Sequence, residues 1–443
     1  MSFPRYERYK DSRVKWLEEL PEQWKHASLR YACGRITDGS HFSPKSIEEG
    51  KSYVTVRNIE SGKVNVEGAA KISQEDFEQL EKAGCRPSLN DVLFSKDGTV
   101  GKVAIVENND FVVLSSLAII SPHPEKLDSK FLFYFLQSVN GEKQIESLYA
   151  GAALRRITLD AIVGIWLPLP GLYEQQTIIT FLDYEITKID ELVAAQQRLI
   201  DLLKEKRQAA ISHAVTKGLN PNVLMKDSGI EWLGEVPQHW DVTSLKRECS
   251  LLKDGTHLPP PRVAKGIPLL SVRNIQCGKF DFREDDTLIS EESYHTLCKS
   301  FIPKPNDVLL AIVGATLGKV ALVPDGLDKF HIQRSLAIFR PVTRMNPKWL
   351  NFVFQAQKFQ QLLWAHVSYS AQPGIYLGTL AQFRIPLPSL TEQNLITSFL
   401  DSETSKLDTL ITEAKCAIEL FNERRAALIS AVVTGKINIS KLV

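Results

Sequence analysis

Several signatures of enzymes and membrane proteins are missing from this sequence of 443 residues. Its six cysteines are scattered and never form a C-x-x-C pair, which argues against a zinc site or a disulfide framework and suits a reducing cytosol. The longest apolar stretches, near residues 112–120 and 162–170, are far shorter than a membrane span. Residues 1–13 are charged and lack the apolar core of a signal peptide. We therefore expect a soluble protein of the cytoplasm.

Catalytic motifs are missing as well. The segments 98–102 and 314–319 combine glycines with a lysine, but their spacing differs from the phosphate-binding loop G-x-x-x-x-G-K-[ST] and a valine follows each lysine. The run 258–261 lacks both ends of the Asp/Asn-Pro-Pro-aromatic motif for base methylation, and the nine histidines show no metal-ligand spacing. These absences predict a chain with no catalytic site, metal or cofactor of its own.

Neither sign of charge is in excess, because the net charge is only +1. A DNA-binding protein usually has a more basic total. Only the surface that faces DNA must be basic, however, so a near-neutral total does not exclude DNA binding. It suggests that a partner helps to hold the DNA.

The chain does contain an internal repeat, with an offset of roughly 216 to 219 residues. The matching segments run in the same order in both copies and share motifs such as Asp-Gly-Ser/Thr-His, Val-Arg-Asn-Ile, Gly-Lys-Val and Phe-Leu-Asp. They include 38–41 with 254–257, 56–59 with 272–275, 101–103 with 318–320, and 181–183 with 399–401. So many ordered matches indicate a duplicated gene.

Each copy divides into two parts. The first part contains short β-branched runs broken by glycine, proline, asparagine and aspartate, which predict strands joined by turns, with helices at 130–138 and 347–357. The second part follows a Pro-x-Pro segment and has the period of an amphipathic helix of roughly 35 residues, or about 50 Å. We predict an α+β fold with globular domains at 1–172 and 219–390 and helical regions at 173–218 and 391–443.

Apolar residues in each helical region fit the a and d positions of one heptad frame. They are Leu182, Ile189, Leu192, Leu199, Leu203 and Ala210 in the first region, and Leu400, Leu407, Leu410, Ala417, Phe421 and Leu428 in the second. Such a helix can belong to an ordinary bundle, but two similar helices at matching places in a repeat favour a coiled coil with each other. Because the second helix must return, we expect antiparallel helices, a globular domain at each end and a pseudo-two-fold axis.

The chain resembles a known family over essentially its whole length. The resemblance rests on the Lys-Asp-Ser-Gly-Ile-Glu-Trp-Leu-Gly-Glu-Val-Pro-x-x-Trp opening at 226–240, the Asp-Gly-Thr-His loop, the Gly-Lys-Val segments, and the Leu-Pro-x-Pro segment before a Glu-Gln that opens a long helix. No single motif is specific to this family, but the order of the motifs, repeated in both copies, is specific to it. The chain is similar to the specificity subunit of type I restriction-modification systems.

This resemblance implies two target-recognition domains that alternate with two helical spacers. Each domain would read one half of a bipartite, asymmetric DNA target. The helices would set the spacer between the half-sites and dock two methyltransferase subunits and two ATP-driven translocase-nuclease subunits.

Residues that both copies share cannot explain why two half-sites differ. Arg57 and Arg273, Asn58 and Asn274, and Lys102 and Lys319 are therefore expected to contact phosphate or to hold the fold. The Asp-Gly-Ser/Thr-His loop, with Ser40, His41, Thr256 and His257, either stabilises itself or contacts a DNA groove.

Base-reading residues are expected where the copies diverge, at 42–50 against 258–266, 63–86 against 279–304, and 150–157 against 368–375. In the last pair, Arg155 and Arg156 stand against Gln372, and Lys96 similarly stands against Ile312. Arginine pairs with guanine and glutamine with adenine in the major groove, so these residues are candidate readers, although each could lie in a merely solvated loop. Two rival functions stay open: a nucleotide hydrolase that uses 98–102, and a coiled-coil adaptor without DNA readout.

Overall fold

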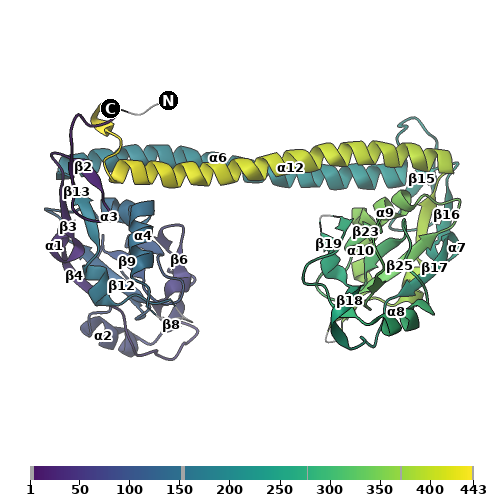
Figure 1. The fold of residues 1–443 in the computed structure, drawn as a ribbon, viewed down its shortest axis with the longest axis horizontal. Helices are drawn as coiled ribbons and strands as arrows, with labels where there is room; N and C mark the ends of the chain where they lie inside the picture. Colours follow the sequence, from purple (N-terminus) through teal and green to yellow (C-terminus); the bar gives the residue numbers. More distant parts are fainter. Residues whose placement is uncertain (1–3, 151–154, 277, 370–371, 442–443) are drawn as a thin grey trace. The chain divides into compact units, whose positions relative to one another are not determined.

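The computed structural model describes residues 4–150, 155–276, 278–369 and 372–441. The chain forms two compact units: unit one comprises residues 1–196 and 416–443, and unit two comprises residues 197–415. Each unit contains the globular part of one copy of the repeat and a stretch of both long helices (Figure 1). No helix in the described part of the chain has both the length and the apolarity that crossing a membrane requires.

Unit one is built on a four-stranded antiparallel sheet with the strand order β10-β9-β12-β4. Its strands are β4 (Cys33–Asp38), β9 (Val92–Ser95), β10 (Val103–Ile105) and β12 (Leu117–Pro122). A smaller mixed sheet contains β5 (Lys51–Val54), β8 (Ala70–Ile72) and β11 (Phe111–Val113). The paired strands are β1 (Tyr9–Asp11) with β2 (Glu19–Pro21), β3 (Lys25–Ser28) with β13 (Trp166–Leu169), and β6 (Ile59–Glu60) with β7 (Lys63–Val64). The short helices are α1 (Leu29–Ala32), α2 (Gln74–Lys82), α3 (Ser129–Leu136), α4 (Val139–Ser147) and α5 (Leu159–Val163).

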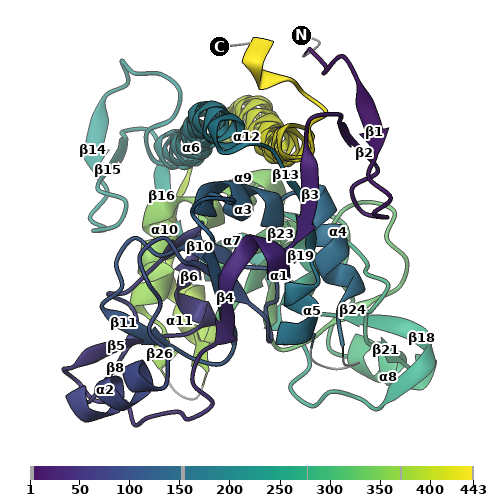
Figure 2. The same cartoon turned by 90° about the vertical axis from the view of Figure 1, so that its left-hand side faces the viewer.

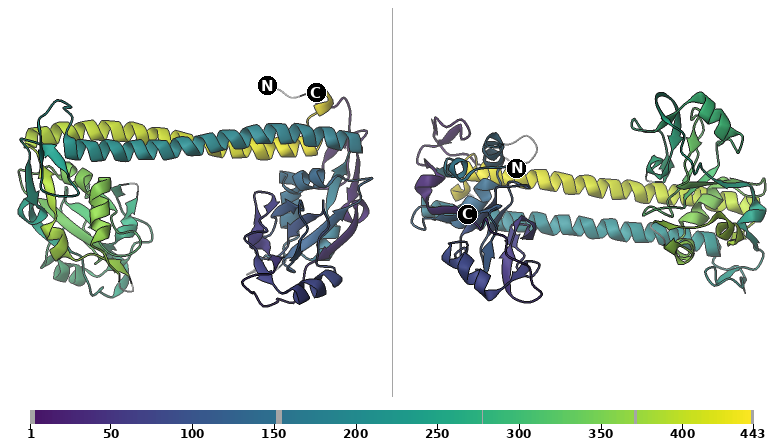
Figure 3. Two further views of the ribbon diagram at one scale, coloured as in Figure 1. Left: turned by 180° about the vertical axis from the view of Figure 1, so that it is seen from behind. Right: turned by 90° about the horizontal axis from the view of Figure 1, so that it is seen from below.

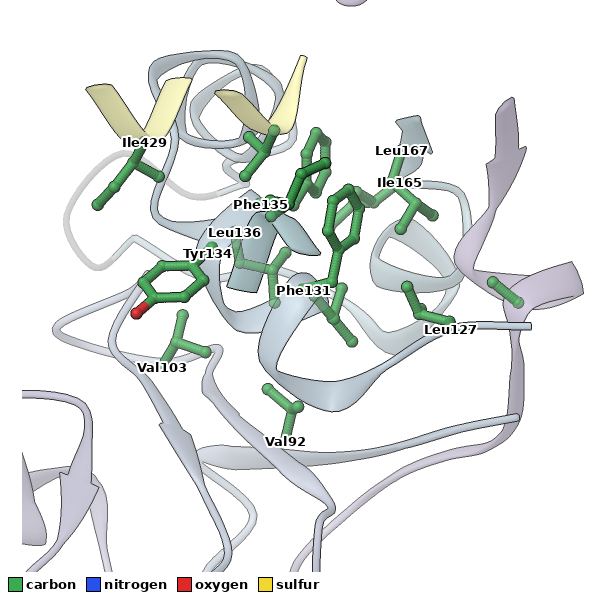
Figure 4. Packing of buried hydrophobic residues seen from close by; sticks show 14 of the residues in the cluster. Val92, Val103, Leu127, Phe131, Tyr134, Phe135, Leu136, Ile165, Leu167 and Ile429 are labelled. Atoms are coloured by element: carbon green, nitrogen blue, oxygen red, sulfur yellow. The ribbon is translucent and has the colours of Figure 1, made fainter. Parts of the chain in front are cut away.

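Both faces of strand β9 are buried, which explains its unbroken apolar run. On one face, Val92 belongs to a core cluster with Phe131 and Phe135 of α3. Figure 4 shows these α3 side chains between the strand residues and Ile429 of a long helix. On the other face, Leu93 packs in a separate cluster with residues of the smaller sheet. Helix α3 therefore lies between the main sheet and the long helices of unit one (Figure 2).

Unit two repeats this plan with a six-stranded sheet of order β17-β25-β22-β23-β20-β19. Its strands are β17 (Cys249–Asp254), β19 (Ile275–Gln276), β20 (Lys279–Phe280), β22 (Val308–Ala311), β23 (Val320–Leu322) and β25 (Leu336–Pro341). The smaller sheet contains β18 (Arg262–Leu270), β21 (Leu288–Ile289) and β24 (His331–Ile332). The pairs are β14 (Met225–Asp227) with β15 (Glu235–Pro237), β16 (Asp241–Ser244) with β28 (Arg384–Leu387), and β26 (Ser368–Tyr369) with β27 (Pro373–Gly374). The helices are α7 (Leu245–Glu248), α8 (Glu291–Cys298), α9 (Pro347–Gln355), α10 (Gln357–Ala365) and α11 (Leu377–Gln382).

The long helices are α6 (Leu172–Lys217), of 46 residues, and α12 (Leu390–Val433), of 44 residues. They lie side by side within each unit (Figure 3) and are antiparallel there. In unit one Asp190 pairs with Arg425 at 3.1 Å, and in unit two Arg207 pairs with Asp408 at 2.9 Å. Arg207 follows Asp190 by 17 residues in α6, and Asp408 precedes Arg425 by 17 residues in α12. The two helices are therefore paired in the same register in both units. The predicted α+β fold with two antiparallel long helices is confirmed.

The predicted heptad frame is right in one row and wrong in the other. The buried members of the first row are Leu182, Ile189, Leu203, Leu400, Leu407 and Leu428, and Phe421 is half-buried. Leu192, Leu199 and Leu410, assigned to the second row, are between 43% and 46% exposed. The buried second row lies one residue later, at Ile186, Ile200, Thr404 and Ile411. The sequence alone did not reveal this frame, because several leucines lie outside the seam, the face along which the two helices pack, and because seam positions such as Gln196 and Arg207 are polar.

Two repeated motifs attach each long helix to the globular domain of its own unit. Gln175 is fully buried; its Oε1 accepts the Asp128 N–H at 2.8 Å and its Nε2 donates to the carbonyl of Lys126 at 2.8 Å. Gln393 makes the equivalent bonds to Asn346 and Arg344 in unit two. An ion pair at the Phe-Leu-Asp motif adds to each attachment, Lys130–Asp183 at 2.7 Å and Lys348–Asp401 at 2.6 Å. The Glu-Gln and Phe-Leu-Asp motifs recur because both copies need this junction.

Candidate nucleic-acid interface

The Asp-Gly-Ser/Thr-His loop leaves the end of the first strand of each main sheet, β4 or β17. In unit one His41 Nε2 lies 3.1 Å from Asp38 Oδ2, and in unit two His257 Nε2 lies 2.7 Å from Asp254 Oδ2. The histidine side chains remain 78% and 67% exposed. Each imidazole is thus oriented by a carboxylate and still faces outward, so the two interpretations of this histidine, loop stabiliser and groove contact, are compatible.

The hydroxyl groups of Ser40 and Thr256 hold the turn of this loop. The Ser40 hydroxyl donates to the carbonyl of Phe42 at 2.7 Å and accepts the Phe42 N–H at 2.9 Å. The Thr256 hydroxyl donates to the Leu258 carbonyl at 2.8 Å. A serine or threonine at this position therefore serves the loop conformation.

A charged cluster lies beside the loop in unit one. The Lys96 ammonium is 3.4 Å from Asp38 and 3.1 Å from Asp97, and its side chain is only 9% exposed. Arg156 also pairs with Asp97. Burial alone would raise the pKa of Asp97, but hydrogen bonds from Lys96 and Arg156 outweigh it and hold that pKa below its usual value. Lys96 is thus engaged within the fold, which favours a structural role over base reading.

Arg155, next to this cluster, is exposed and directly precedes Arg156, which bridges to Ala150. Its guanidinium stacks 5.3 Å above the ring of Tyr149, and its backbone carbonyl accepts the N–H of Gly98. The ring covers one face of the guanidinium and takes none of its N–H donors, so with respect to Tyr149 the donor edges stay available to pair with a base. Among the predicted readers of unit one, Arg155 is exposed and forms no ion pair with a described residue, whereas Lys96 and Arg156 both pair with Asp97.

The equivalent region of unit two has lost the charged cluster. Ile312 and Val313 replace Lys96 and Asp97, and Val313 bridges to Gly374 as Asp97 bridges to Arg156. A hollow of about 530 Å³ takes the place of the cluster and is lined in part by Ile312, Val313, His257, Arg334 and Gln372. The two equivalent surfaces therefore differ in chemistry: unit one has the ion pairs of Asp97, whereas unit two has a hollow lined by apolar residues together with the Asp254–His257 pair.

The strand register also corrects the comparison of Arg155 and Arg156 with Gln372. Ala150 bridges to Arg156, and Ser368 pairs with Gly374, so Arg156 matches Gly374 rather than Gln372. The position that matches Gln372 falls within 151–154, which lies outside the described residues, as do 370–371 of the same predicted segments.

The Val-Arg-Asn segment forms a single 3-10 turn in each copy, Val56–Asn58 and Val272–Asn274. Asn58 and Asn274 are buried, and each accepts the backbone N–H three residues earlier, from Thr55 and Ser271, at 2.9 Å. The asparagines therefore hold the fold. Arg57 is exposed without an ion pair among the described residues, whereas Arg273 pairs with Asp285.

The Gly-Lys-Val segments belong to hairpins between two strands, β9–β10 and β22–β23. A phosphate-binding loop needs a strand followed by a helix, so the nucleotide-hydrolase alternative is wrong. Lys102 turns inward, where its ammonium donates to the carbonyls of Ile59 at 2.9 Å and Val56 at 3.4 Å. Lys319 is exposed. The structure thus supports a structural role for Lys102, which holds two backbone carbonyls. A phosphate contact stays a prediction for Lys319 alone of the two.

The sequence did not reveal three participants in these sites: the pairing carboxylate Asp97, the stacking ring Tyr149, and the exposed Arg334 at the hollow of unit two. The i,i+3 spacing of Asp38 and His41 was a usable signal for the loop pair. No comparable signal existed for the others. The pairing of Asp97 with Arg156 and the hollow beside Arg334 join distant segments, and the six-residue spacing of Tyr149 and Arg155 does not by itself indicate a contact.

The two domains share one fold, and each is fixed to its own stretch of the long helix pair. Their equivalent loops carry different side chains. These features define a duplicated specificity protein. The model of the type I restriction modification DNA specificity domain matches residues 45–201 and 267–420, well over half of the chain. The chain belongs to this family.

Individual relatives agree with this assignment. The chain is 24% identical over 360 residues to the type I restriction enzyme MjaVIII specificity subunit of Methanocaldococcus jannaschii, which covers 80% of each protein. It is 21% identical over 442 residues to the EcoBI specificity subunit of Escherichia coli, covering 96% of this chain and 89% of that protein.

Solved structures share the fold. The HsdS subunit from Thermoanaerobacter tengcongensis matches with a TM-score of 0.51 and 18% identity, over 94% of this chain and 98% of that chain. A chain from a study of complex assembly and conformational transition of the type I R-M system matches with a TM-score of 0.69 and 17% identity, over the same shares.

Proposed function

We propose that this chain is the DNA-recognising specificity subunit of a type I restriction-modification system, with unit one reading one half of a bipartite, asymmetric target and unit two reading the other. The contrast between equivalent surfaces carries this division. Unit one has Lys96, Asp97 and Arg156 where unit two has Ile312, Val313 and Gly374. One fold with two sets of loop side chains is what two different half-sites require.

The proposed partners are methyltransferase subunits and ATP-dependent translocase-nuclease subunits, with the chain itself performing neither methyl transfer nor cleavage. The names of the relatives, type I restriction enzyme specificity subunits, support this part of the proposal. Exposed leucines outside the helix seam, at equivalent positions in both copies, support docking of partners on the helices. They are Leu192 and Leu202 on α6 and Leu410 and Leu420 on α12. Methyl transfer by the isolated chain would contradict this assignment.

The decisive experiment maps methylated adenines across the genome of a host with and without this gene. We expect one bipartite, asymmetric motif to lose methylation when the gene is deleted. A methylation pattern that does not change would favour the adaptor function instead.

A single substitution then tests which unit reads which half. Arg155→Ala removes an exposed guanidinium that lies over the Tyr149 ring and forms no ion pair with a described residue, so it should relax one base pair in one half-site by about 1–3 kcal/mol. Arg30→Ala, another exposed arginine in unit one, is the matched control and should leave the motif unchanged. If Arg155→Ala weakened every sequence equally, this segment would contact only the DNA backbone.

A further inference from the structure

An exposed apolar side chain follows the histidine of the Asp-Gly-Ser/Thr-His loop in both copies. Phe42 is 55% exposed in unit one and Leu258 is 86% exposed in unit two. A single exposed apolar residue is ordinary on a protein surface. Its recurrence at one equivalent position, in loops whose following residues diverge, indicates a common use.

Framework contacts fix the backbone that carries these side chains. Besides the hydroxyl hydrogen bonds of Ser40 and Thr256, the glycine of each loop lies against a strand of the smaller sheet. A Cβ on Gly39 would lie 2.1 Å from the Val113 carbonyl oxygen, and one on Gly255 would lie 2.2 Å from that of Ile332. Only glycine permits this close approach, so both loops are anchored from behind while Phe42 and Leu258 point away from the core.

The residues beside each apolar side chain suit a nucleic acid rather than an apolar protein surface. Phe42 adjoins His41, with Lys96 and Arg156 in the same ion-pair network, and Leu258 adjoins His257, which lines the same hollow as Arg334. After Leu258 come three prolines, 259–261, and then the exposed Arg262. In unit one the carboxylates of Asp38 and Asp97 belong to the same network, so the apolar tip lies beside an imidazole and paired charges. A stiff loop with an apolar tip in such polar surroundings matches the way proteins insert a wedge into a base stack.

We propose that Phe42 and Leu258 each insert between adjacent base pairs of the half-site that their unit reads. This inference rests on the proposed function and adds the mode of contact. Insertion separates two stacked base pairs, and the apolar area removed from water together with contacts from the neighbouring polar groups offsets the lost stacking. The preformed loop reduces the ordering cost of binding. Because its ring can stack on a base, Phe42 should contribute more than Leu258.

The test uses the full chain, co-purified from its host with its accompanying subunits, and duplexes that carry the mapped motif. The fluorescent base 2-aminopurine replaces one base at a time along each half-site. Wild type should raise the fluorescence at one step in each half-site, because unstacking relieves the quenching of this base. Phe42→Ala should abolish the rise in the half-site of unit one only and lower affinity at least about fivefold. Leu258→Ala should do the same in the other half-site.

Two further variants separate insertion from a general defect. Leu89→Ala removes an apolar side chain of unit one that is as exposed as Phe42, at 55%, and lies outside the segments expected to read bases; it should leave both fluorescence and affinity unchanged. Phe42→Leu, which copies unit two, should keep most of the fluorescence rise. Specific binding without any local rise, or equal effects of Phe42→Ala and Leu89→Ala, would overturn the insertion while leaving the proposed function intact. Absence of any motif-specific binding would overturn both.

Discussion

Replacing Lys96 by isoleucine, the residue that unit two has at this position, should destabilise unit one by about 3 kcal/mol, the low end for breaking a buried ion pair. The lysine is almost fully buried between Asp38 and Asp97. Its loss leaves both carboxylates without their shared cation. The cost stays at the low end because these carboxylates keep 19% and 21% exposure and Arg156 still pairs with Asp97.

The second substitution of the pair should reverse most of this loss. Asp97→Val alone should cost about 1–2 kcal/mol, because Lys96 keeps Asp38 as a partner. The double variant Lys96→Ile with Asp97→Val recreates the Ile312-Val313 pair of unit two and should lie within about 1 kcal/mol of wild type, since replacing a buried ion pair by apolar residues is often neutral. The expected coupling energy is therefore about 3–5 kcal/mol in magnitude.

Urea unfolding of the full chain at neutral pH, followed by tryptophan fluorescence, measures these free energies. Its pH dependence gives a second check. The pKa of Asp97 is lowered in the folded state, so its stabilisation is complete above the unfolded pKa of about 3.9 and is lost as pH falls through the lower folded value. Wild type should lose this part of its stability below about pH 4, and the double variant should not. Single costs that simply add in the double variant would refute the pairing.

Three other predictions concern the helices and the framework. Ile189→Ala should destabilise the chain by about 2–4 kcal/mol and Leu192→Ala by less than about 1 kcal/mol, measured by the same unfolding assay; equal losses would restore the original heptad frame. Lys102→Ala should lower stability by about 1–2 kcal/mol without changing the salt dependence of DNA binding, whereas a flatter salt dependence would indicate a phosphate contact. The third change inserts four residues near Ala195 and four more opposite it near Leu420. Each insertion lengthens its helix by about 6 Å and rotates the residues beyond it by about 40°, which is close to the turn of one base pair. The methylated motif should therefore gain one base pair of spacer, and an unaltered spacer would mean that other elements set the distance.

The sequence was sufficient for the fold class and for the long helices, because both rest on local patterns that the duplication shows twice. The heptad frame was harder to find. Leucines such as Leu192 occupy exposed positions, while Arg207 occupies a half-buried position in the seam, so hydrophobicity alone selected the wrong second row. Burial of a helix face depends on the partner helix, and a single sequence does not contain that information.

The candidate site was predictable in its location and only partly in its chemistry. Lys96 follows β9 and Asp38 ends β4, two strands that are separated in the sheet by β12, so their ion pair depends on strand order rather than on sequence spacing. Lys102 likewise reaches carbonyls more than 40 residues away in the chain. A repeated lysine in a glycine turn is indistinguishable from a phosphate contact until this pairing is known.

Identity between the copies and exposure to solvent together separate three kinds of residue. Identical buried residues such as Gln175 and Asn58, with their counterparts, satisfy hydrogen bonds that either copy needs. Exposed residues that differ between copies are free to distinguish two half-sites. His41 and His257 are identical and yet exposed, so neither the core nor a particular base accounts for both of them. A contact that is the same at both half-sites explains this combination, and in duplex DNA that contact is the sugar-phosphate backbone. The loop histidines should therefore position each unit on DNA, beside side chains that read it.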